Sequence, residues 1–313
     1  MRVIRNTDPS LYFMLTIRTA GAKLWMIPSR EVKQLVGGIL ARYQEIYKIE
    51  IYSYFFLSNH FHLLIRAPLG NYSEFCMNLD REVALRMNWR LRRTGQFWAK
   101  RFNATMIGER EEDLLDAFLY ITTNATRHGL LKDSKDWPGL HSYTHSLNER
   151  DREFTFYHYS ARDDEPKQTK HLLKLSILPQ FESLTKNQRT KELKRLLEEK
   201  QKRIDNERKE QGKSGYMSVQ TILSQEIGEA PIRVSRKKVA ICYTSCIELW
   251  KRKKRELKDR LEHYSQASAE YRLGKTSYTF PPFCFMPPLH IIPRLFRFQP
   301  LALFQKEIFV NIG

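Results

Sequence analysis

The chain has 313 residues, 42% of them hydrophobic, which is enough for one large domain or two ordinary ones and excludes a disordered protein. Its 53 lysines and arginines against 35 aspartates and glutamates give a formal net charge of +18. Such an excess is typical of proteins that act on a polyanion, and nucleic acid is the first candidate. We expect no membrane span, because no uncharged apolar run is long enough, and no secretion signal at the N-terminus.

The first part of the chain alternates between strand and helix patterns. Residues 11–18 are rich in aromatic and β-branched side chains and predict a strand. Ser29 suits a helix N-cap, and apolar residues then recur at helical spacing. Residues 51–57 and 61–67 predict two more strands, and the short polar step between them predicts a hairpin turn.

The same pattern continues to about residue 145. Residues 72–91 predict a long basic helix, residues 97–107 a fourth strand, and residues 111–127 another helix with an apolar side. Strands interrupted by helices, with one hairpin among them, predict an α+β fold in which helices cover a small, mostly antiparallel sheet. We expect this domain to occupy residues 1–145.

The composition changes in the second half of the chain. Residues 148–166 are polar and predict an irregular segment, and residues 183–212 predict a highly charged helix. Residues 236–238 and 251–255 are two dense basic clusters. Residues 280–293 are rich in proline and aromatic side chains. We therefore expect residues 146–313 to form a charged, mostly helical C-terminal extension with an extended tail.

The four cysteines do not have the paired C-x-x-C spacing of a zinc ribbon. Cys242 and Cys246 are four residues apart, a spacing that predicts one shared helix face, and neither Cys76 nor Cys284 supplies a second pair. We expect buried thiols rather than metal ligands. This cysteine usage fits a reducing, cytoplasmic compartment.

The most informative motif is His60-Phe61-His62, inside an apolar run. Residues two apart on a strand share a face, so both imidazoles project the same way while Phe61 points into a core. Neutral imidazole is a common ligand of transition metals, so the pair predicts a divalent-cation site. Two half-buried histidines with hydrogen-bond partners and no metal would give the same pattern.

A second group of chemical residues lies on the helix predicted from residue 111. Tyr120 and Asn124 are four residues apart, so they share a face of this helix, and Gly129 suits the left-handed residue that ends it. A tyrosine hydroxyl can act as a covalent nucleophile. An asparagine oxygen can complete the coordination of a cation already held by two histidines. Alone, each would equally suit a core tyrosine and a helix-end cap.

Together these motifs resemble the HUH-type single-strand DNA tyrosine transposases of small insertion sequences, in particular their REP-associated branch. The resemblance covers about the first half of the chain, in the family's order. It rests first on an N-H-Φ-H-L-L strand at residues 59–64 and a G-x-x-W-x-x-R-F segment at residues 95–102. A Y-I-x-x-N helix ending in G-L follows at residues 120–130, and a closing stretch with tryptophan, serine and tyrosine at residues 136–143.

Three positions depart from the family pattern. Ala125 stands where the family has a proline, His128 where it has an alanine, and Leu57-Ser58 where a methionine-proline pair is common. None of these changes removes a group to which the resemblance gives a chemical role. The C-terminal half of the chain has no counterpart in the pattern.

The resemblance implies a metal-dependent enzyme that nicks and rejoins single-stranded DNA, commonly beside a hairpin. Tyr120 would attack the scissile phosphate, a 3′-hydroxyl would leave, and a 5′-phosphotyrosine would store the bond energy for rejoining. His60, His62 and Asn124 would hold Mg²⁺ or Mn²⁺, and no nucleotide cofactor is implied.

Basic side chains around this motif set are the candidates for phosphate contacts. They are Arg81, Arg86, Arg90, Lys100, Arg101 and Arg127. Phe97 and Trp98 have the ring types that stack on bases, but strand aromatics usually pack inward, so we favour a core position for Trp98. The expected partner is single-stranded DNA that forms hairpins, with no membrane, and both a monomer and a homodimer stay open.

Two other functions stay open. A non-catalytic protein that binds single-stranded DNA or hairpins would keep the fold and the basic surface, but it would not need all four chemical residues. A rolling-circle replication initiator or relaxase shares the two-histidine strand, but such proteins often place the tyrosine differently or carry two. In each case we expect a bacterial cytoplasmic protein associated with the nucleoid.

Overall fold

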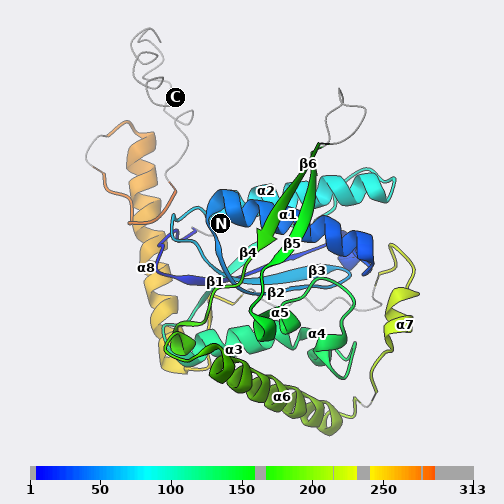
Figure 1. Ribbon diagram of the computed structural model, residues 1–313. Coiled ribbons are helices and arrows are strands. Elements are labelled where there is room, and N and C mark those ends of the chain that lie inside the picture. The colour runs from blue at the N-terminus through cyan, green and yellow to red at the C-terminus, as the bar shows by residue number, and fades with distance from the viewer. Residues whose placement is uncertain (1–4, 159–166, 214, 231–239, 276–277, 286–313) are drawn as a thin grey trace. The chain divides into compact units, whose positions relative to one another are not determined.

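The computed structural model describes residues 5–158, 167–213, 215–230, 240–275 and 278–285 (Figure 1). The chain divides into two compact units, one of Pro9–Trp250 and one of Met1–Asp8 with Lys251–Gly313. In chain order the elements are β1 (Tyr12–Arg18), η1 (Ala20–Ala22), α1 (Arg30–Tyr47), β2 (Glu50–Phe56), β3 (His60–Arg66), α2 (Tyr72–Arg90), β4 (Asn103–Ile107), α3 (Glu111–Thr122), α4 (Asn124–Arg127), η2 (Ser134–Asp136), α5 (Tyr143–Asn148), β5 (Arg152–His158), β6 (Lys167–Leu173), η3 (Pro179–Phe181), α6 (Lys186–Glu210), α7 (Val219–Leu223), β7 (Cys242–Tyr243) and α8 (Ile247–Arg272).

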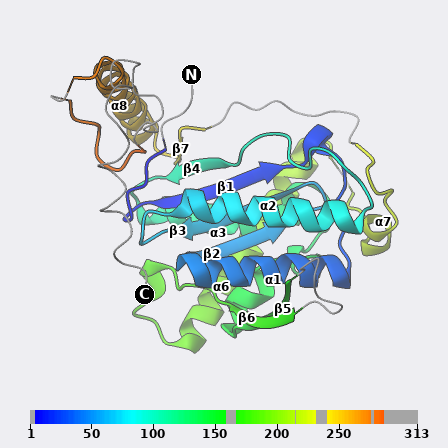
Figure 2. The ribbon, with the colours of Figure 1, turned by 90° about the horizontal axis from the view of Figure 1, so that it is seen from above.

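A five-stranded sheet of order β2-β3-β1-β4-β7 forms the centre of the larger unit. The first four strands pair antiparallel, and β7 adds to the edge of β4 in parallel. Helices α1 and α2 lie on one face of the sheet and α3 on the other, as Figure 2 also shows from above. The structure thus confirms the predicted α+β fold, including the hairpin that joins β2 to β3.

The two faces of the sheet carry separate hydrophobic cores. Leu15 and Leu63 pack with residues of α1 and α2, whereas Met14 and Leu64 pack with residues of α3. This division follows from the alternation of side chains along each strand. The histidines of β3 have the same parity as Leu64, so they face α3.

Two predicted elements differ in extent from the observed ones. Only the second part of residues 97–107 is strand, because Phe97 and Trp98 turn into the core, where the Trp98 Nε1 donates to the Asp80 carbonyl at 2.8 Å. The predicted helix 111–127 is interrupted at Thr123. There the hydroxyls of Thr122 and Thr123 donate back to backbone carbonyls at 2.8 and 2.7 Å, a competition that disturbs helical hydrogen bonding.

The expectation of an irregular segment at residues 148–166 is wrong for its described part. β5 pairs with β6 in an antiparallel hairpin that packs on α1 through the buried rings of Phe154 and Phe156. Two glycines of α1 allow this close approach. A Cβ on Gly37 would lie 2.3 Å from the Phe154 ring, and one on Gly38 would lie 2.3 Å from the Thr155 carbonyl oxygen.

The larger unit includes residues 146–250, which the sequence assigns to the C-terminal extension. The predicted charged helix forms as α6 and packs against α3, α4 and α5. Its Arg189 makes a bidentate ion pair with Glu149 at 2.8 Å, and its Gln201 accepts from the Ser134 backbone N–H at 2.7 Å. Cys242 lies on β7 and Cys246 precedes α8, so the expectation that they share a helix face is wrong.

The smaller unit holds most of α8 and the described part of the tail. Arg260 of α8 donates to the Phe283 carbonyl at 2.8 Å, and Tyr264 packs against Phe280. The basic cluster at 251–255 lies on α8, whereas residues 236–238 and 286–293 fall outside the described residues. In the part of the chain that the structure describes, no helix is long and apolar enough to cross a membrane.

Candidate active site

The two predicted histidines lie side by side on β3. Both face α3, and they are only 6% and 7% exposed. The ring centroids of His60 and His62 are 5.1 Å apart, with the rings nearly perpendicular. Across the sheet, His60 pairs with Arg18 and His62 with Thr16 of β1. The strand and its histidine-bearing face are therefore confirmed.

Hydrogen bonds to the Nδ1 atoms orient both imidazoles. The Nδ1 of His60 is 2.6 Å from the Oδ1 of Asn59, whose Nδ2 donates to the Ala22 carbonyl. The bond from Asn59 Nδ2 to the Ala22 carbonyl leaves the Asn59 Oδ1 facing the ring, so the His60 Nδ1–H is the donor to Oδ1. The Nδ1 of His62 is 2.8 Å from the Thr16 hydroxyl, which can accept in the same way. Metal-ligating histidines are usually held by such bonds, and Nε2 then serves as the ligating atom.

Both imidazoles are neutral at pH 7. Burial, with smaller contributions from the charges of His128 and Arg18, lowers the pKa of His62 to about 3. Burial also holds the pKa of His60 well below its usual value, helped by His62. A neutral imidazole keeps the lone pair that a metal ion needs, so the buried pair is ready to bind a cation.

The segment formed by α3 and α4 places two side chains against the histidines. Positions 120, 124 and 128 follow one another at a spacing that shares a helix face. The Tyr120 ring lies 5.8 Å from the His62 ring, and the His128 ring lies 5.7 Å from the His60 ring. Asn124 lies between Tyr120 and His128 in the chain, at the start of α4.

Asn124 is fully buried, and neither atom of its amide has a hydrogen-bond partner among the described residues. Burying an unpaired amide costs about 1–3 kcal/mol, so the position calls for a ligand. Among residues with described positions, no group of three or more His, Cys, Asp and Glu can hold a metal ion. Two neutral imidazoles and one unpaired amide oxygen nevertheless form a mixed nitrogen and oxygen donor set that fits Mn²⁺ or Mg²⁺.

The unpaired amide leads to a prediction of opposite effects on stability and metal binding. Asn124→Leu is expected to raise the free energy of unfolding of the metal-free protein by about 1–2 kcal/mol, because the uncompensated polar burial disappears. The same change should weaken Mn²⁺ binding. Urea unfolding and titration calorimetry measure the two effects. A less stable variant with unchanged Mn²⁺ affinity would show that the amide has another purpose.

The Tyr120 ring has two further neighbours. The guanidinium of Arg127 lies over the ring, 4.6 Å from its centroid, and the ring of Tyr243 packs at 5.8 Å. The Nε of Arg127 is buried and has no hydrogen-bond partner within the described part of the chain. A cation with an unused donor, packed on the ring of a candidate nucleophile, suits the contact with a phosphate.

Lys100 and Arg101 lie near the end of the sheet at which His60 pairs with Arg18. Both are exposed in the loop that precedes β4. The loop is held by a bond from the Ala99 N–H to the Arg18 carbonyl at 2.8 Å, and Arg18 is the residue paired with His60.

Helix α2, which carries Arg81, Arg86 and Arg90, lies on the face of the sheet opposite α3 (Figure 1). Arg81 is exposed on this helix. Arg86 bonds to Glu82 at 2.7 Å and donates to the Tyr157 carbonyl at 2.7 Å, so it holds the β5–β6 hairpin. Arg90 lies 3.7 Å from Glu31. The structure thus brings only part of the predicted basic set to the candidate active site.

Four neighbours of the site were not predicted as site residues. Thr16 and Arg18 lie beside the histidines because of the register of β1 with β3, which the sequence alone does not specify. Tyr243 belongs to a segment far along the chain. His128 stood out in the sequence only as a departure from the family pattern, and its ring contact with His60 is the reason to include it.

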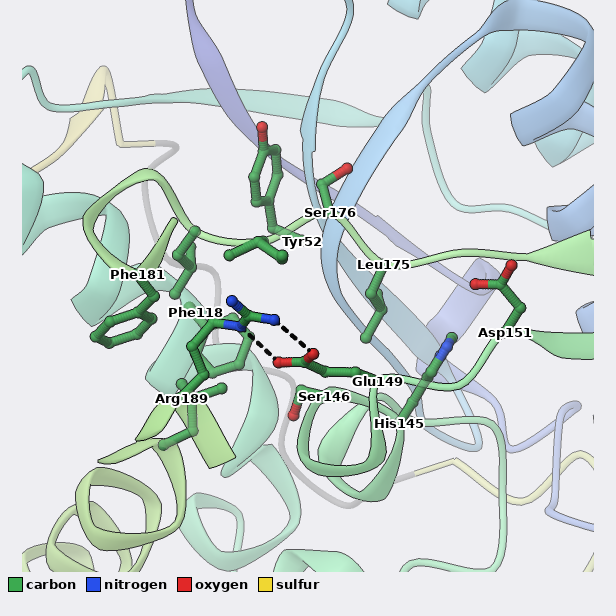
Figure 3. Close-up of a pocket in the computed structure, with 13 residues that line it drawn as sticks. Tyr52, Phe118, His145, Ser146, Glu149, Asp151, Leu175, Ser176, Phe181 and Arg189 are labelled. Carbon is green, nitrogen blue, oxygen red and sulfur yellow. Dashed lines mark hydrogen bonds and ion pairs between the residues drawn. The ribbon is translucent and has the colours of Figure 1, made fainter. Parts of the chain in front are cut away.

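Two hollows of the larger unit lie apart from this site. One, of about 180 Å³, is lined by Tyr52, Phe118, His145 and the Glu149–Arg189 ion pair (Figure 3). The other, of about 460 Å³, lies between α1, α2 and β5 and includes the exposed Trp89. Neither hollow is lined by the two histidines of β3 or by Tyr120.

Because of two other buried histidines, we expect the folded protein to lose stability in acid. Burial, and next the charge of Arg152, lower the pKa of His141 and of His145 to about 3. Below pH 6.5 the unfolded chain binds protons at these imidazoles that the folded chain does not. The free energy of unfolding should therefore fall as the pH drops from 6.5 toward 3, by about 1.4 kcal/mol per pH unit for each histidine.

Urea unfolding between pH 7 and pH 5 measures this dependence. His145→Gln should remove the contribution of one histidine, and above pH 6.5 the slope should be the same in both proteins. Equal slopes below pH 6 would mean that His145 is protonated in the folded chain.

Part of the chain is similar to known proteins. Residues 26–124 match the family model described as "Transposase IS200 like". A search of curated proteins finds no match. A solved structure of a REP-associated tyrosine transposase bound to a REP hairpin is 16% identical, with a TM-score of 0.39 over 47% of this chain and 84% of that chain. The matched segment contains both histidines and Tyr120 and ends at Asn124, and it confirms the resemblance of this part of the chain to the IS200-like DNA transposases.

Proposed function

We propose that the protein is a transposase that nicks and rejoins single-stranded DNA through a covalent bond between Tyr120 and a 5′-phosphate. The observation that carries the proposal is the packing of the Tyr120 ring against His62, which lies beside His60 as a buried, neutral pair. The buried, unpaired amide of Asn124 follows four residues after Tyr120. All four residues lie in the segment that matches the IS200-like transposases.

The proposed reaction exchanges one phosphoester bond for another. The Tyr120 hydroxyl attacks the phosphorus and loses its proton, the bond from phosphorus to the 3′-oxygen breaks, and that oxygen leaves as a 3′-hydroxyl. A second 3′-hydroxyl reverses the step on another DNA end. A divalent cation held by His60, His62 and Asn124 would polarise the scissile phosphate and offset the charge of the transition state.

We propose that Arg127, Lys100 and Arg101 bind the phosphates that flank the scissile one, since they lie at the histidine end of the sheet. Arg81, Arg86 and Arg90 lie on the other layer, where they would contact a different stretch of the DNA, such as a hairpin stem. The excess of positive charge in the whole chain supports single-stranded DNA as the partner.

Incubation with hairpin-forming single-stranded oligonucleotides and Mn²⁺ or Mg²⁺, followed by a denaturing gel, tests the proposed function. A label at the 3′ end should move with the protein, because the protein keeps the 5′-phosphate of the downstream fragment. A label at the 5′ end should appear in a shorter, free fragment. Tight binding without any covalent band, across a broad hairpin library, would favour a non-catalytic binding protein.

A further inference from the structure

The C-terminal half of the chain contributes one aromatic ring to the candidate active site. β7 pairs with β4 through Met106 with Cys242 and Ile107 with Tyr243. The Gly108 N–H extends this pairing by donating to the Tyr243 carbonyl at 2.9 Å. The register places the Tyr243 ring 5.8 Å from the Tyr120 ring, at an interplanar angle of 62°.

A buried carboxylate anchors this strand to the helix that carries Tyr120. Asp113, in the first turn of α3, is 1% exposed on its side chain and accepts from the Thr244 hydroxyl at 2.9 Å. Arg110 donates to Asp113 at 2.7 Å and to the Ser245 hydroxyl at 2.8 Å. The segment after β7 is thus tied to the start of α3 by charged and hydroxyl groups, independently of the sheet.

Gly108 shows how closely the anchor is packed. A Cβ at this position would lie 2.1 Å from the Asp113 Oδ2 and 3.0 Å from the Thr244 Cβ. Since only glycine fits between the strand edge and the carboxylate, the sequence at this turn supports a fixed position for β7 rather than a loose contact.

Three elements together enclose the Tyr120 ring. His62 of β3 meets it edge-on, Arg127 of α4 covers it, and Tyr243 of β7 packs against it. Holding a reacting group in the geometry of attack is a large part of enzymatic rate enhancement, and a tyrosine side chain has two torsions to fix.

We propose that Tyr243 is a positioning residue, whose ring holds Tyr120 in the orientation for in-line attack. The proposal rests on the nucleophilic role proposed for Tyr120 above. It gives the extension a function within the reaction, because β7 completes the surroundings of the nucleophile. The ring rather than the hydroxyl of Tyr243 makes the contact, so Tyr243→Phe is the conservative variant.

The chain offers a matched control for this contact. Tyr12 of β1 packs edge-on against Tyr52 at 5.4 Å, in the same hydrophobic core, but it pairs with Arg66 at the far end of β3 from His60. Tyr12→Leu therefore removes a similar pair of tyrosine rings without touching the site.

Two measurements on Tyr243→Leu test the proposal. In single-turnover reactions with a labelled hairpin oligonucleotide, we expect the rate of adduct formation to fall by about tenfold or more. The dissociation constant for the DNA should stay within about twofold, because a positioning residue affects the step after binding. Tyr243→Phe and Tyr12→Leu should react at the wild-type rate.

The second measurement does not depend on cleavage. With 3-fluorotyrosine at position 120, the ¹⁹F resonance should shift and narrow in Tyr243→Leu, because the ring gains freedom, and stay unchanged in Tyr12→Leu. An unchanged resonance and rate in Tyr243→Leu, or an equal loss of rate in Tyr12→Leu, would overturn the positioning role. If the wild-type protein forms no adduct while the resonance still shifts, the contact stands and the nucleophilic function fails.

A milder variant covers the case in which Tyr243→Leu does not fold. Thr244→Val removes the hydroxyl bond to Asp113 but keeps the Tyr243 ring. It should change the rate and the ¹⁹F resonance in the same direction by a smaller amount. No change in either quantity would contradict the proposed anchoring of β7.

Discussion

Tyr120→Phe is expected to abolish the covalent protein–DNA adduct while leaving DNA binding within about twofold of the wild-type protein. The loss of rate should exceed about 10³-fold, the scale seen when a nucleophile is removed and only binding remains. The structure explains why binding should survive. His62, Arg127 and Tyr243 all contact the ring of Tyr120, and phenylalanine keeps that ring. Denaturing gels and fluorescence anisotropy measure the two quantities.

Tyr243→Phe is the matched control for this experiment. It removes a hydroxyl from the neighbouring ring, and adduct formation should continue at the wild-type rate. Persistence of the adduct in Tyr120→Phe would show that another residue is the nucleophile. Loss of the adduct in Tyr243→Phe alone would point to Tyr243 as that residue.

His62→Ala is expected to weaken Mn²⁺ binding by about 10²-fold and to remove adduct formation at any practical Mn²⁺ concentration. The expected cause is the loss of one of two neutral imidazoles that share a face of β3. Electron paramagnetic resonance of free Mn²⁺ measures the affinity without DNA or cleavage. His60→Ala should behave in the same way, because its Nδ1 is held by Asn59, which would leave Nε2 as the ligating atom.

His141→Gln is the control for the loss of a buried imidazole. His141 is 4% exposed and has the same low pKa of about 3, but its ring packs against Phe55. The variant should keep the wild-type Mn²⁺ affinity. Mn²⁺ binding that is equal in His62→Ala and His141→Gln would exclude the histidines of β3 as ligands.

Much of the candidate site could be predicted because it depends on local periodicity. The alternation on β3 places His60 and His62 on one face, and the Tyr120 ring of the predicted helix lies against that face. The hairpin before His60 and the N-cap at Ser29 are also local, and the structure confirms both. The register of β1 is not local, so Thr16 could not be found as the partner of His62.

The errors have a common physical origin in long-range packing. The segment that forms the β5–β6 hairpin is mostly polar, and its packing on α1 rests on a few apolar side chains, Phe154, Phe156 and Leu173. The basic residues of α2 belong to one helix, but sequence does not say which face of the sheet that helix covers. Tyr243 reaches Tyr120 only because β7 joins the far edge of the sheet. Each case depends on a contact between segments whose pairing no local pattern specifies.

Mapping the residue that carries the DNA tests the central claim most directly. The covalent adduct is digested with protease and nuclease, and mass spectrometry identifies the peptide that retains a nucleotide. The account predicts a phosphotyrosine linkage at Tyr120, formed only when a divalent cation is present. A nucleotide on Tyr243 or on any other residue, or cleavage without a covalent linkage, would contradict it.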